Sequence, residues 1–178
     1  MFGIQTQAQA FEKGNNFVSL GYGFPNFNTA LFKAFDENEG FSYSGIGPIH
    51  VKFEHAVSDH FGIGLSINGV SASASYKENN YNYEFNRSSI KFNARVNYHF
   101  GEMEKFDPYI GMGFGYGTSR TKLTTKDPNG SNESFPSFFP IGWESTIGTR
   151  YLLTDNIGIY TEVGLAKSLI QFGGCFKF

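Results

Sequence analysis

Apolar and polar residues alternate along most of this chain, a pattern typical of β-strands that have one apolar face. The clearest example is residues 87–100, where Ile90, Phe92, Ala94, Val96, Tyr98 and Phe100 alternate with polar residues. The same pattern recurs at residues 17–24, 41–54, 61–68, 109–117, 141–151, 157–165 and 169–178. No segment has the spacing of a long amphipathic helix. The sequence therefore predicts an all-β meander of eight antiparallel strands.

The third of these segments changes phase beyond Gly69. Its apolar positions move from Phe61, Ile63, Leu65 and Ile67 to Val70, Ala72 and Ala74. One extra residue in a strand produces such a shift, so we expect a β-bulge at this point.

The connections between the segments alternate in length. Short ones span residues 55–60, 101–106 and 152–156, whereas longer polar ones span residues 25–40, 76–85 and 119–138. The last connection, at 166–168, is tight. Short turns at one end and long loops at the other are the layout of an up-and-down transmembrane barrel, with both termini at the short-turn end.

Composition decides which face of the strands points outward. Aromatic residues make up 18% of the 178 residues and charged residues only 17%. The apolar face carries roughly thirty large side chains, but an eight-stranded barrel is only just wide enough to be filled by side chains. We therefore expect the apolar face to contact lipid and not to enclose a ligand, as it would in a lipocalin-like barrel. The net charge of −2 argues against a nucleic-acid partner.

Most charged residues of the strands fall on the small-residue face, which would line the lumen. Inside a narrow lumen such charges must pair, because an isolated buried charge is costly. Both signs are present in near balance, so we expect a charge network that plugs the lumen. Its predicted members are Lys52, Glu54, Lys91, Arg95, Glu144, Arg150, Glu162 and Lys177.

Three segments resemble a known family. Residues 107–117, with the run Pro108-Tyr109-Ile110-Gly111 and alternating glycines, resemble a strand of OmpA/OmpX-type small outer-membrane barrels. Residues 148–164 resemble the penultimate hairpin of that family, and Phe176-Lys177-Phe178 resembles its carboxy-terminal assembly signal.

The resemblance implies a protein of the Gram-negative outer membrane with both termini in the periplasm. Its partners would be outer-membrane lipid and the barrel-assembly machinery, which would read Phe176 and Phe178 during insertion. The family includes structural anchors, adhesins, narrow channels and lipid enzymes, so the resemblance does not select a function.

The N-terminal residues 1–15 are read as a leader, and residues 16–178 as the barrel domain. Ala8-Gln9-Ala10 has the small-x-small form of a signal-peptidase site, which would make Phe11 the mature start. The alternative is a disordered Gln/Ala leader.

A lipid-modifying enzyme would need a histidine with Ser or Asp near the outer leaflet. We place His55, His60 and His99 at the short-turn rim, and His50 inside the lumen, nearer that rim than the long loops. We therefore predict no catalytic site and no cofactor. The pair His55 and His60 is a weak metal signal, and we expect a solvated turn with no metal. Glycines at 111, 113, 115 and 117 are expected to make room for Tyr109 or Arg95.

The loops carry the remaining hypotheses. Phe27, Leu31, Phe32 and Phe35 have near-helical spacing and precede an acidic run at 36–39, which indicates a possible partner-docking loop. Phe138 and Phe139 are assigned to an interfacial aromatic girdle. The predicted role is structural or interactive, as a membrane-integrity protein or an accessory subunit of a larger outer-membrane complex. The alternatives are a narrow small-solute channel and, less favoured, a lipid-modifying enzyme.

Overall fold

The computed structural model describes residues 9–26, 42–78, 81–101, 103–125, 132–136 and 140–178. No helix in this part of the chain is long and apolar enough to cross a membrane. The described residues form nine strands: β1 (Asn16–Phe24), β2 (Ser42–Ala56), β3 (Phe61–Glu78), β4 (Tyr81–His99), β5 (Phe106–Thr125), β6 (Glu133–Pro136), β7 (Ile141–Leu152), β8 (Ile157–Leu165) and β9 (Ile170–Lys177).

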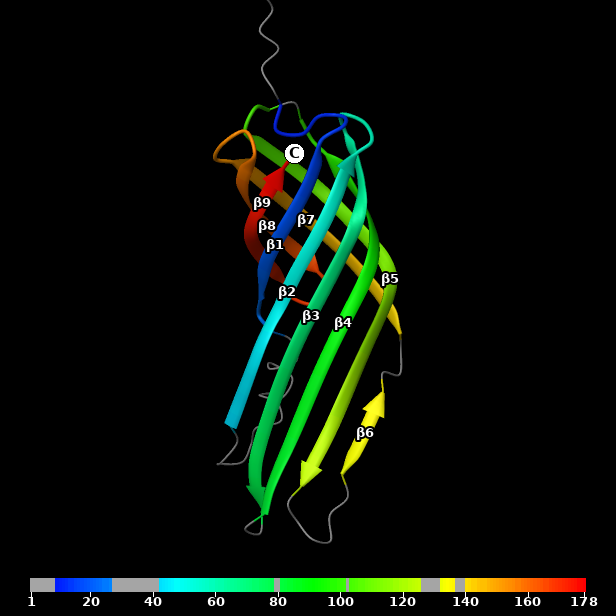
Figure 1. Cartoon of the computed structure of the whole chain (residues 1–178), viewed down its shortest axis with the longest axis vertical. Coiled ribbons are helices and arrows are strands. Elements are labelled where there is room, and N and C mark those ends of the chain that lie inside the picture. Colours follow the sequence, from blue (N-terminus) through cyan, green and yellow to red (C-terminus); the bar gives the residue numbers. More distant parts are fainter. Residues whose placement is uncertain (1–8, 27–41, 79–80, 102, 126–131, 137–139) are drawn as a thin grey trace, which may run out of the picture.

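Eight of the strands form a closed antiparallel barrel, which confirms the predicted fold. The order β4-β3-β2-β1-β9-β8-β7-β5 closes through the pairing of β4 with β5. Strand β6 is a short addition that pairs with β5 from Arg120 to Leu123, beyond the segment of β5 that pairs with β7. Figure 1 shows β6 at one end of the molecule, beside the far half of β5, and the C-terminus at the opposite end.

Large apolar side chains cover the outside of the barrel, and small or polar ones fill the inside. Met112 and Ile147 are 64% and 66% exposed, whereas the inward Ser66 and Thr146 are 1% and 2% exposed. This distribution is the reverse of that in a water-soluble barrel. It agrees with the volume argument, because the narrow interior has room only for the smaller set.

Strands β3, β4 and β5 continue well past the apolar belt. In register, Gly69 of β3 pairs with Ile90 of β4, which pairs with Thr118 of β5. On the near side of this level the outward residues of β3 and β5 are apolar, and on the far side they are Ser71, Ser73, Ser75, Thr118, Arg120, Lys122 and Thr124. We call residues 70–78, 81–89 and 118–125, with β6, the strand extension. The outer surface thus changes from apolar to polar at one level on three neighbouring strands.

The predicted bulge beyond Gly69 is wrong. Strands β3 and β4 keep one continuous register from Phe61 opposite Tyr98 to Glu78 opposite Tyr81. Val70, Ala72 and Ala74 are buried on the same inward side as Ser66 and Asn68, so the phase never shifts. The residue types change because the strand leaves its apolar surroundings, and the register shift lies instead in β2, between Ile46 and Ile49.

Two of the predicted loops are largely strand. The segment 76–85 contains the end of β3 and the start of β4, and β5 continues through the predicted loop start to Thr125. The polar composition of these segments, taken as a loop signal, reflects strands whose outer face is solvated. Phe138 and Phe139 lie outside the described residues.

At the short-turn end, two backbone hydrogen bonds join the start of the first strand to the end of the chain. The amide of Asn16 donates to the Phe178 carbonyl (2.8 Å), and the Phe178 amide donates to the Asn16 carbonyl (2.9 Å). Just before β1, Ala10 and Phe11 are each 1% exposed, and the Ala10 amide donates to the Met103 carbonyl (2.8 Å). Residues that precede the first strand therefore pack into this end of the barrel.

Candidate functional site

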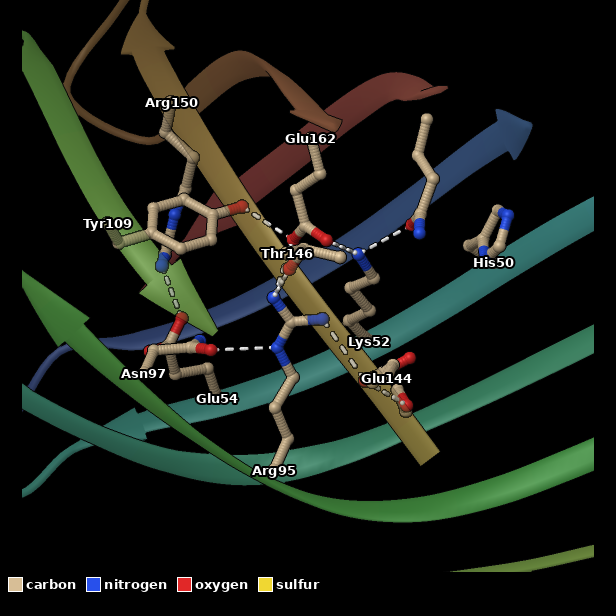
Figure 2. A network of polar contacts seen from close by, with 12 residues as sticks. His50, Lys52, Glu54, Arg95, Asn97, Tyr109, Glu144, Thr146, Arg150 and Glu162 are labelled. Carbon is tan, nitrogen blue, oxygen red and sulfur yellow. Dashed lines mark hydrogen bonds and ion pairs between the residues drawn. The ribbon is translucent and has the colours of Figure 1, made fainter. Parts of the chain in front are cut away.

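The centre of the lumen holds a network of charged side chains around Arg95 of β4 (Figure 2). Its guanidinium forms ion pairs with Glu144 of β7 (3.1 Å) and Glu162 of β8 (2.8 Å). It makes two further hydrogen bonds: Nε donates to Asn97 Oδ1 (2.7 Å) and Nη2 to Thr146 Oγ1 (2.9 Å). One cation thus connects β4 to β7 and β8, which are distant from it in sequence.

Glu162 joins this centre to the opposite wall. Its carboxylate pairs with the Lys52 ammonium of β2 at 2.6 Å and accepts a hydrogen bond from the Tyr109 hydroxyl at 2.7 Å. Lys52 also donates to the side-chain oxygen of Gln171 on β9 (2.7 Å). These contacts span the lumen from β2 to β5, β8 and β9.

A second cluster fills the short-turn end. Arg150 pairs with Glu54 and, through Nε, with Asp107 (3.1 Å). His99 places Nε2 at 2.8 Å from Glu54 and Nδ1 at 2.6 Å from Asp107. Both ring nitrogens therefore face carboxylate oxygens, an arrangement that a doubly protonated imidazolium satisfies because only that form has two N–H donors.

Two aromatic rings cover this cluster. The Phe11 ring stacks on His99 with centroids 3.5 Å apart, and the Arg150 guanidinium lies 4.0 Å from the centroid of Phe17. Both phenylalanines are 1% exposed. The charged cluster is thus shielded from solvent at the short-turn end by aromatic faces that attract cations.

We call these eight charged groups the lumen plug: Lys52, Arg95, His99, Arg150, Glu54, Asp107, Glu144 and Glu162. With His99 protonated, four cations face four carboxylates. All eight residues are at most 7% exposed. A cavity lined by five of them, Lys52, Glu54, Arg95, Arg150 and Glu162, has a volume of about 10 Å³, at the lower limit for one water molecule. Around this cavity the plug is therefore packed side chain against side chain.

Glycines on β5 make space for the plug. A Cβ on Gly111 would collide with the Arg95 guanidinium and the Asn97 side chain, and one on Gly113 would lie 2.8 Å from Glu144 Cγ. Gly111 therefore makes room for Arg95, as the sequence pattern suggested, and Gly113 makes room for Glu144. The Tyr109 ring is accommodated by Gly148 of β7 instead, where a Cβ would lie 2.9 Å from Tyr109 Cζ.

Six of the eight residues predicted for the charge network lie in the lumen plug. The other two lie elsewhere: the Lys177 ammonium donates to the Gln9 carbonyl (2.8 Å), and Lys91 lies half-buried toward the strand extension. The prediction missed His99 and Asp107, although both fall on the inward phase of their strands. Alternation could have identified them, but both sit near strand ends: His99 was placed at the short-turn rim, and Asp107 was given no role in the lumen.

The other predicted residues are distributed as follows. Phe176 and Phe178 lie on the outer surface, 48% and 56% exposed, with their rings stacked at 5.8 Å. The proposed docking residues Phe27, Leu31, Phe32 and Phe35 lie outside the described residues. Among the residues that the structure describes, no group of three or more His, Cys, Asp or Glu could hold a metal ion, and His55 Nδ1 lies 2.9 Å from Asn16 Oδ1.

His50 faces the lumen and, along β2, lies closer to the short-turn end at Ala56 than to Ser42 at the other end, as predicted. It also lies beside the turn between β8 and β9, because β8 and β9 are shorter than β2. Its Nδ1 is 2.5 Å from Asn68 Oδ1 and its Nε2 is 3.1 Å from Ser168 Oγ. This Ser–His–Asn order resembles the arrangement used in nucleophilic catalysis.

Access argues against that chemistry. Ser168 and His50 are both 0% exposed. A Cβ on Gly23 of β1 would collide with Ser168 Oγ and come within 2.6 Å of His50 Nε2, so the β1 backbone occupies the approach to both groups. A nucleophile must reach a substrate carbonyl at about 3 Å, and the described structure leaves no such space. The three residues form a buried hydrogen-bond chain.

Comparisons with known proteins agree with this fold. The family model described as "outer membrane protein beta-barrel domain" matches residues 1–171. The chain is similar to Ail, the attachment invasion locus protein of Yersinia pestis, at 14% identity over 93% of this chain and 99% of that one, with a TM-score of 0.51. Its structure in complex with the heparin analogue sucrose octasulfate gives 0.53 at the same identity and coverage.

A third similar structure is the outer membrane protein OprG from Pseudomonas aeruginosa, at 11% identity over 96% of this chain and 99% of that one, with a TM-score of 0.49. No curated protein matches the sequence significantly. At such identities a structural likeness shows the fold alone, so the assignment rests on the family model, which covers nearly the whole chain. The chain belongs to the outer membrane protein β-barrel family, whose members reside in the outer membrane of Gram-negative bacteria.

Proposed function

We propose that this protein is a non-conducting outer-membrane barrel with a structural or interaction role, in which the plugged barrel anchors the strand extension outside the cell. In this orientation both termini and the short turns face the periplasm. The observation that carries the proposal is the lumen plug, whose eight charged residues are nearly inaccessible and line a cavity of only about 10 Å³. A channel would need a connected water path, and a barrel that works as an anchor does not.

The strand extension supports an interaction role. At about 3.3 Å per residue, the nine residues of β3 beyond Gly69 add roughly 30 Å of strand. The outer face of the extension is polar. Residues 42–46 of β2 continue the sheet on the β3 side, beyond Ile49, where the described pairing of β1 with β2 ends. An ordered sheet of this length presents a rigid surface to a partner, such as a larger outer-membrane complex.

Planar-bilayer recording tests the closed lumen. The wild-type protein is expected to give no single-channel steps, whereas a variant that empties the centre, Arg95→Ala/Glu144→Ala/Glu162→Ala, is expected to conduct. The matched control is Arg120→Ala/Lys122→Ala, which removes charges from the outer face and should stay silent. Steady conductance of the wild-type protein would overturn the proposal and favour the narrow-channel alternative.

Co-purification tests the interaction role. The variant to compare replaces residues 74–85 by Asn-Gly between the paired residues Ser73 and Asn86, because this dipeptide closes a two-residue hairpin. Any partner retained by the wild-type protein in mild detergent should be lost from this variant. Phe32→Ser/Phe35→Ser tests the first-loop hypothesis separately: if all co-purifying proteins remain, that loop is not the docking site.

No enzymatic activity is part of the proposal, since the Ser168–His50–Asn68 chain has no access for a substrate. The lipid A profile of cells that lack the protein should match that of the parent strain. A changed acylation pattern, restored by the wild-type protein but not by Ser168→Ala, would show that the chain is catalytic.

A further inference from the structure

Beyond the lumen plug, toward the strand extension, the lumen holds a second group of charges that are all positive. Arg87 and Lys91 face inward from β4, and Lys167 comes from the turn between β8 and β9. The Lys167 ammonium donates to Ser89 Oγ at 2.6 Å, which holds it against β4 between the other two cations. We call Arg87, Lys91 and Lys167 the cationic layer.

The cationic layer differs from the plug in having no counter-charge among the described residues. None of its three members forms an ion pair within 4 Å there, and Arg87 Nε is buried without a hydrogen-bond partner. The carboxylate that acts on Lys91 is Glu144, which already pairs with Arg95 in the plug. Within the described part of the chain, the charge of the layer is therefore not balanced.

The neighbours of the layer are suited to an anion. Arg87 pairs in register with Ala72 and Thr121, and Ser89 pairs with Val70 and Ser119. Hydroxyl groups and small apolar side chains thus surround the cations, with no carboxylate at these register positions to repel an anion.

Solvent reaches part of the layer, unlike the plug. Arg87, Ser89, Lys91, Ser119 and Thr121 are all partly exposed. Lys167, in the turn outside the strands, is 9% exposed, and its pKa is lowered to about 7 because burial and the nearby Lys91 and Arg87 disfavour its charge. A bound anion would remove this repulsion and restore the charged form.

We propose that the cationic layer binds a small soluble molecule that carries a phosphate or sulfate group, with Arg87, Lys91 and Lys167 as the charged ligands and Ser119 and Thr121 as hydroxyl donors. Tetrahedral oxyanions match this set because they accept several charge-assisted hydrogen bonds at once. The layer faces the lumen and not lipid, so the molecule arrives from the strand-extension end. The plug closes the lumen behind it, which makes the site a receptor pocket and not a passage.

Calorimetry with inorganic pyrophosphate, on the full-length protein in a neutral detergent at low ionic strength, tests the site. Arg87→Met/Lys167→Met should weaken binding at least tenfold, since the variant loses two charge-assisted hydrogen bonds to the anion. The matched control is Arg120→Met/Lys122→Met, which removes one Arg and one Lys from the outer face of adjacent β5 and should change affinity less than about twofold.

Sulfate provides a second probe, because its charge is constant near neutral pH. Arg87 and Lys91 on β4 are the charged groups that act on Lys167, and Glu144 of β7 acts on Lys91. His50 of β2 contacts Ser168, the next residue along the turn. Lys167 is charged below its pKa of about 7 and neutral above it, so sulfate affinity should fall as the pH rises through about 7. Lys167→Met should abolish this dependence.

Three outcomes would overturn the proposal. One is equal affinity in the wild-type protein and Arg87→Met/Lys167→Met, when a heat-dependent gel shift shows that both are folded. Another is binding that appears only after Asp36, Glu37 and Glu39 are neutralised, which would identify the chain's own carboxylates as the counter-charge. The third is displacement of sulfate by phosphatidylglycerol vesicles, which would identify a lipid headgroup as the occupant.

Discussion

The outer surface changes from apolar to polar at the Gly69 level. An arginine introduced on the outer face of β3 should therefore destabilise the protein on the apolar side of this level and have little effect on the polar side. Leu65 faces outward with 59% exposure, between Phe53 and Ala94 on the neighbouring strands. It lies four residues on the apolar side of Gly69, and Ser71 lies two residues on the polar side. The two test substitutions are Leu65→Arg and Ser71→Arg.

Strand geometry gives the depths. At about 3.3 Å per residue and a tilt of about 40°, Leu65 lies about 10 Å from the Gly69 level along the membrane normal. An apolar band about 25 Å tall has its midplane about 12 Å from either edge, so Leu65 is close to it. Ser71 lies about 5 Å outside the band by the same arithmetic.

Arginine on the lipid face costs about 2–4 kcal/mol at the midplane and about 0–1 near the interface. Leu65→Arg should therefore lower the unfolding free energy by about 2–4 kcal/mol, and Ser71→Arg by at most about 1. Urea titration of the protein folded into lipid vesicles measures both. Equal losses at the two positions would refute the placement of the membrane boundary, and a larger loss at Ser71 would reverse it.

Three further predictions concern the lumen and are measured by the same urea titration. Arg95→Met should cost about 3–5 kcal/mol because Glu144 and Glu162 stay buried without their cation, and adding Glu144→Gln/Glu162→Gln should recover part of the loss. Gly111→Ala should cost about 1–3 kcal/mol because its Cβ meets the Arg95 guanidinium, whereas Gly69→Ala, with nothing within 4 Å of its Cβ, should cost less than 1. Phe11→Ala should cost about 3–5 kcal/mol because its ring is buried on His99, whereas a comparable loss for the exposed Glu12→Ala would remove that explanation.

The barrel itself could be predicted from the sequence because alternation reports directly on the two faces of a strand. Inside the membrane the contrast between Leu65 and Ser66, or between Met112 and Gly113, is large. Beyond Gly69 the outward face of β3 meets polar surroundings, so the contrast in polarity between the two faces falls. At Val70 it is inverted, since the inward residue is the more apolar one. Alternation could not separate a change of surroundings from a bulge, which is why the strand extension was read as loops.

For most residues of the lumen plug, the sequence predicts that the side chain faces inward, but it does not predict which of these side chains contact one another. Alternation assigns Arg95 and Glu162 to the lumen, but their separation of 67 positions says nothing about their level along the barrel. That level follows from the stagger of the closed sheet, which one register shift in β2 can change. His50 illustrates the consequence: its face was predicted correctly, but its contact with Ser168 in the turn between β8 and β9 was not.

The two charged regions of the lumen obey different physical requirements, and burial explains why. In the plug, every residue is nearly inaccessible, so each charge needs a partner and the sum is zero with His99 protonated. The cationic layer carries three positive charges that only partial solvation can tolerate. Lys91 and Arg95 are both inward on β4 and only four residues apart, yet Arg95 has two carboxylate partners and Lys91 has no ion-pair partner among the described residues. If the layer served stability alone, a carboxylate at Ser119 or Thr121 would neutralise it, so Thr121→Glu should stabilise the barrel while it weakens pyrophosphate binding.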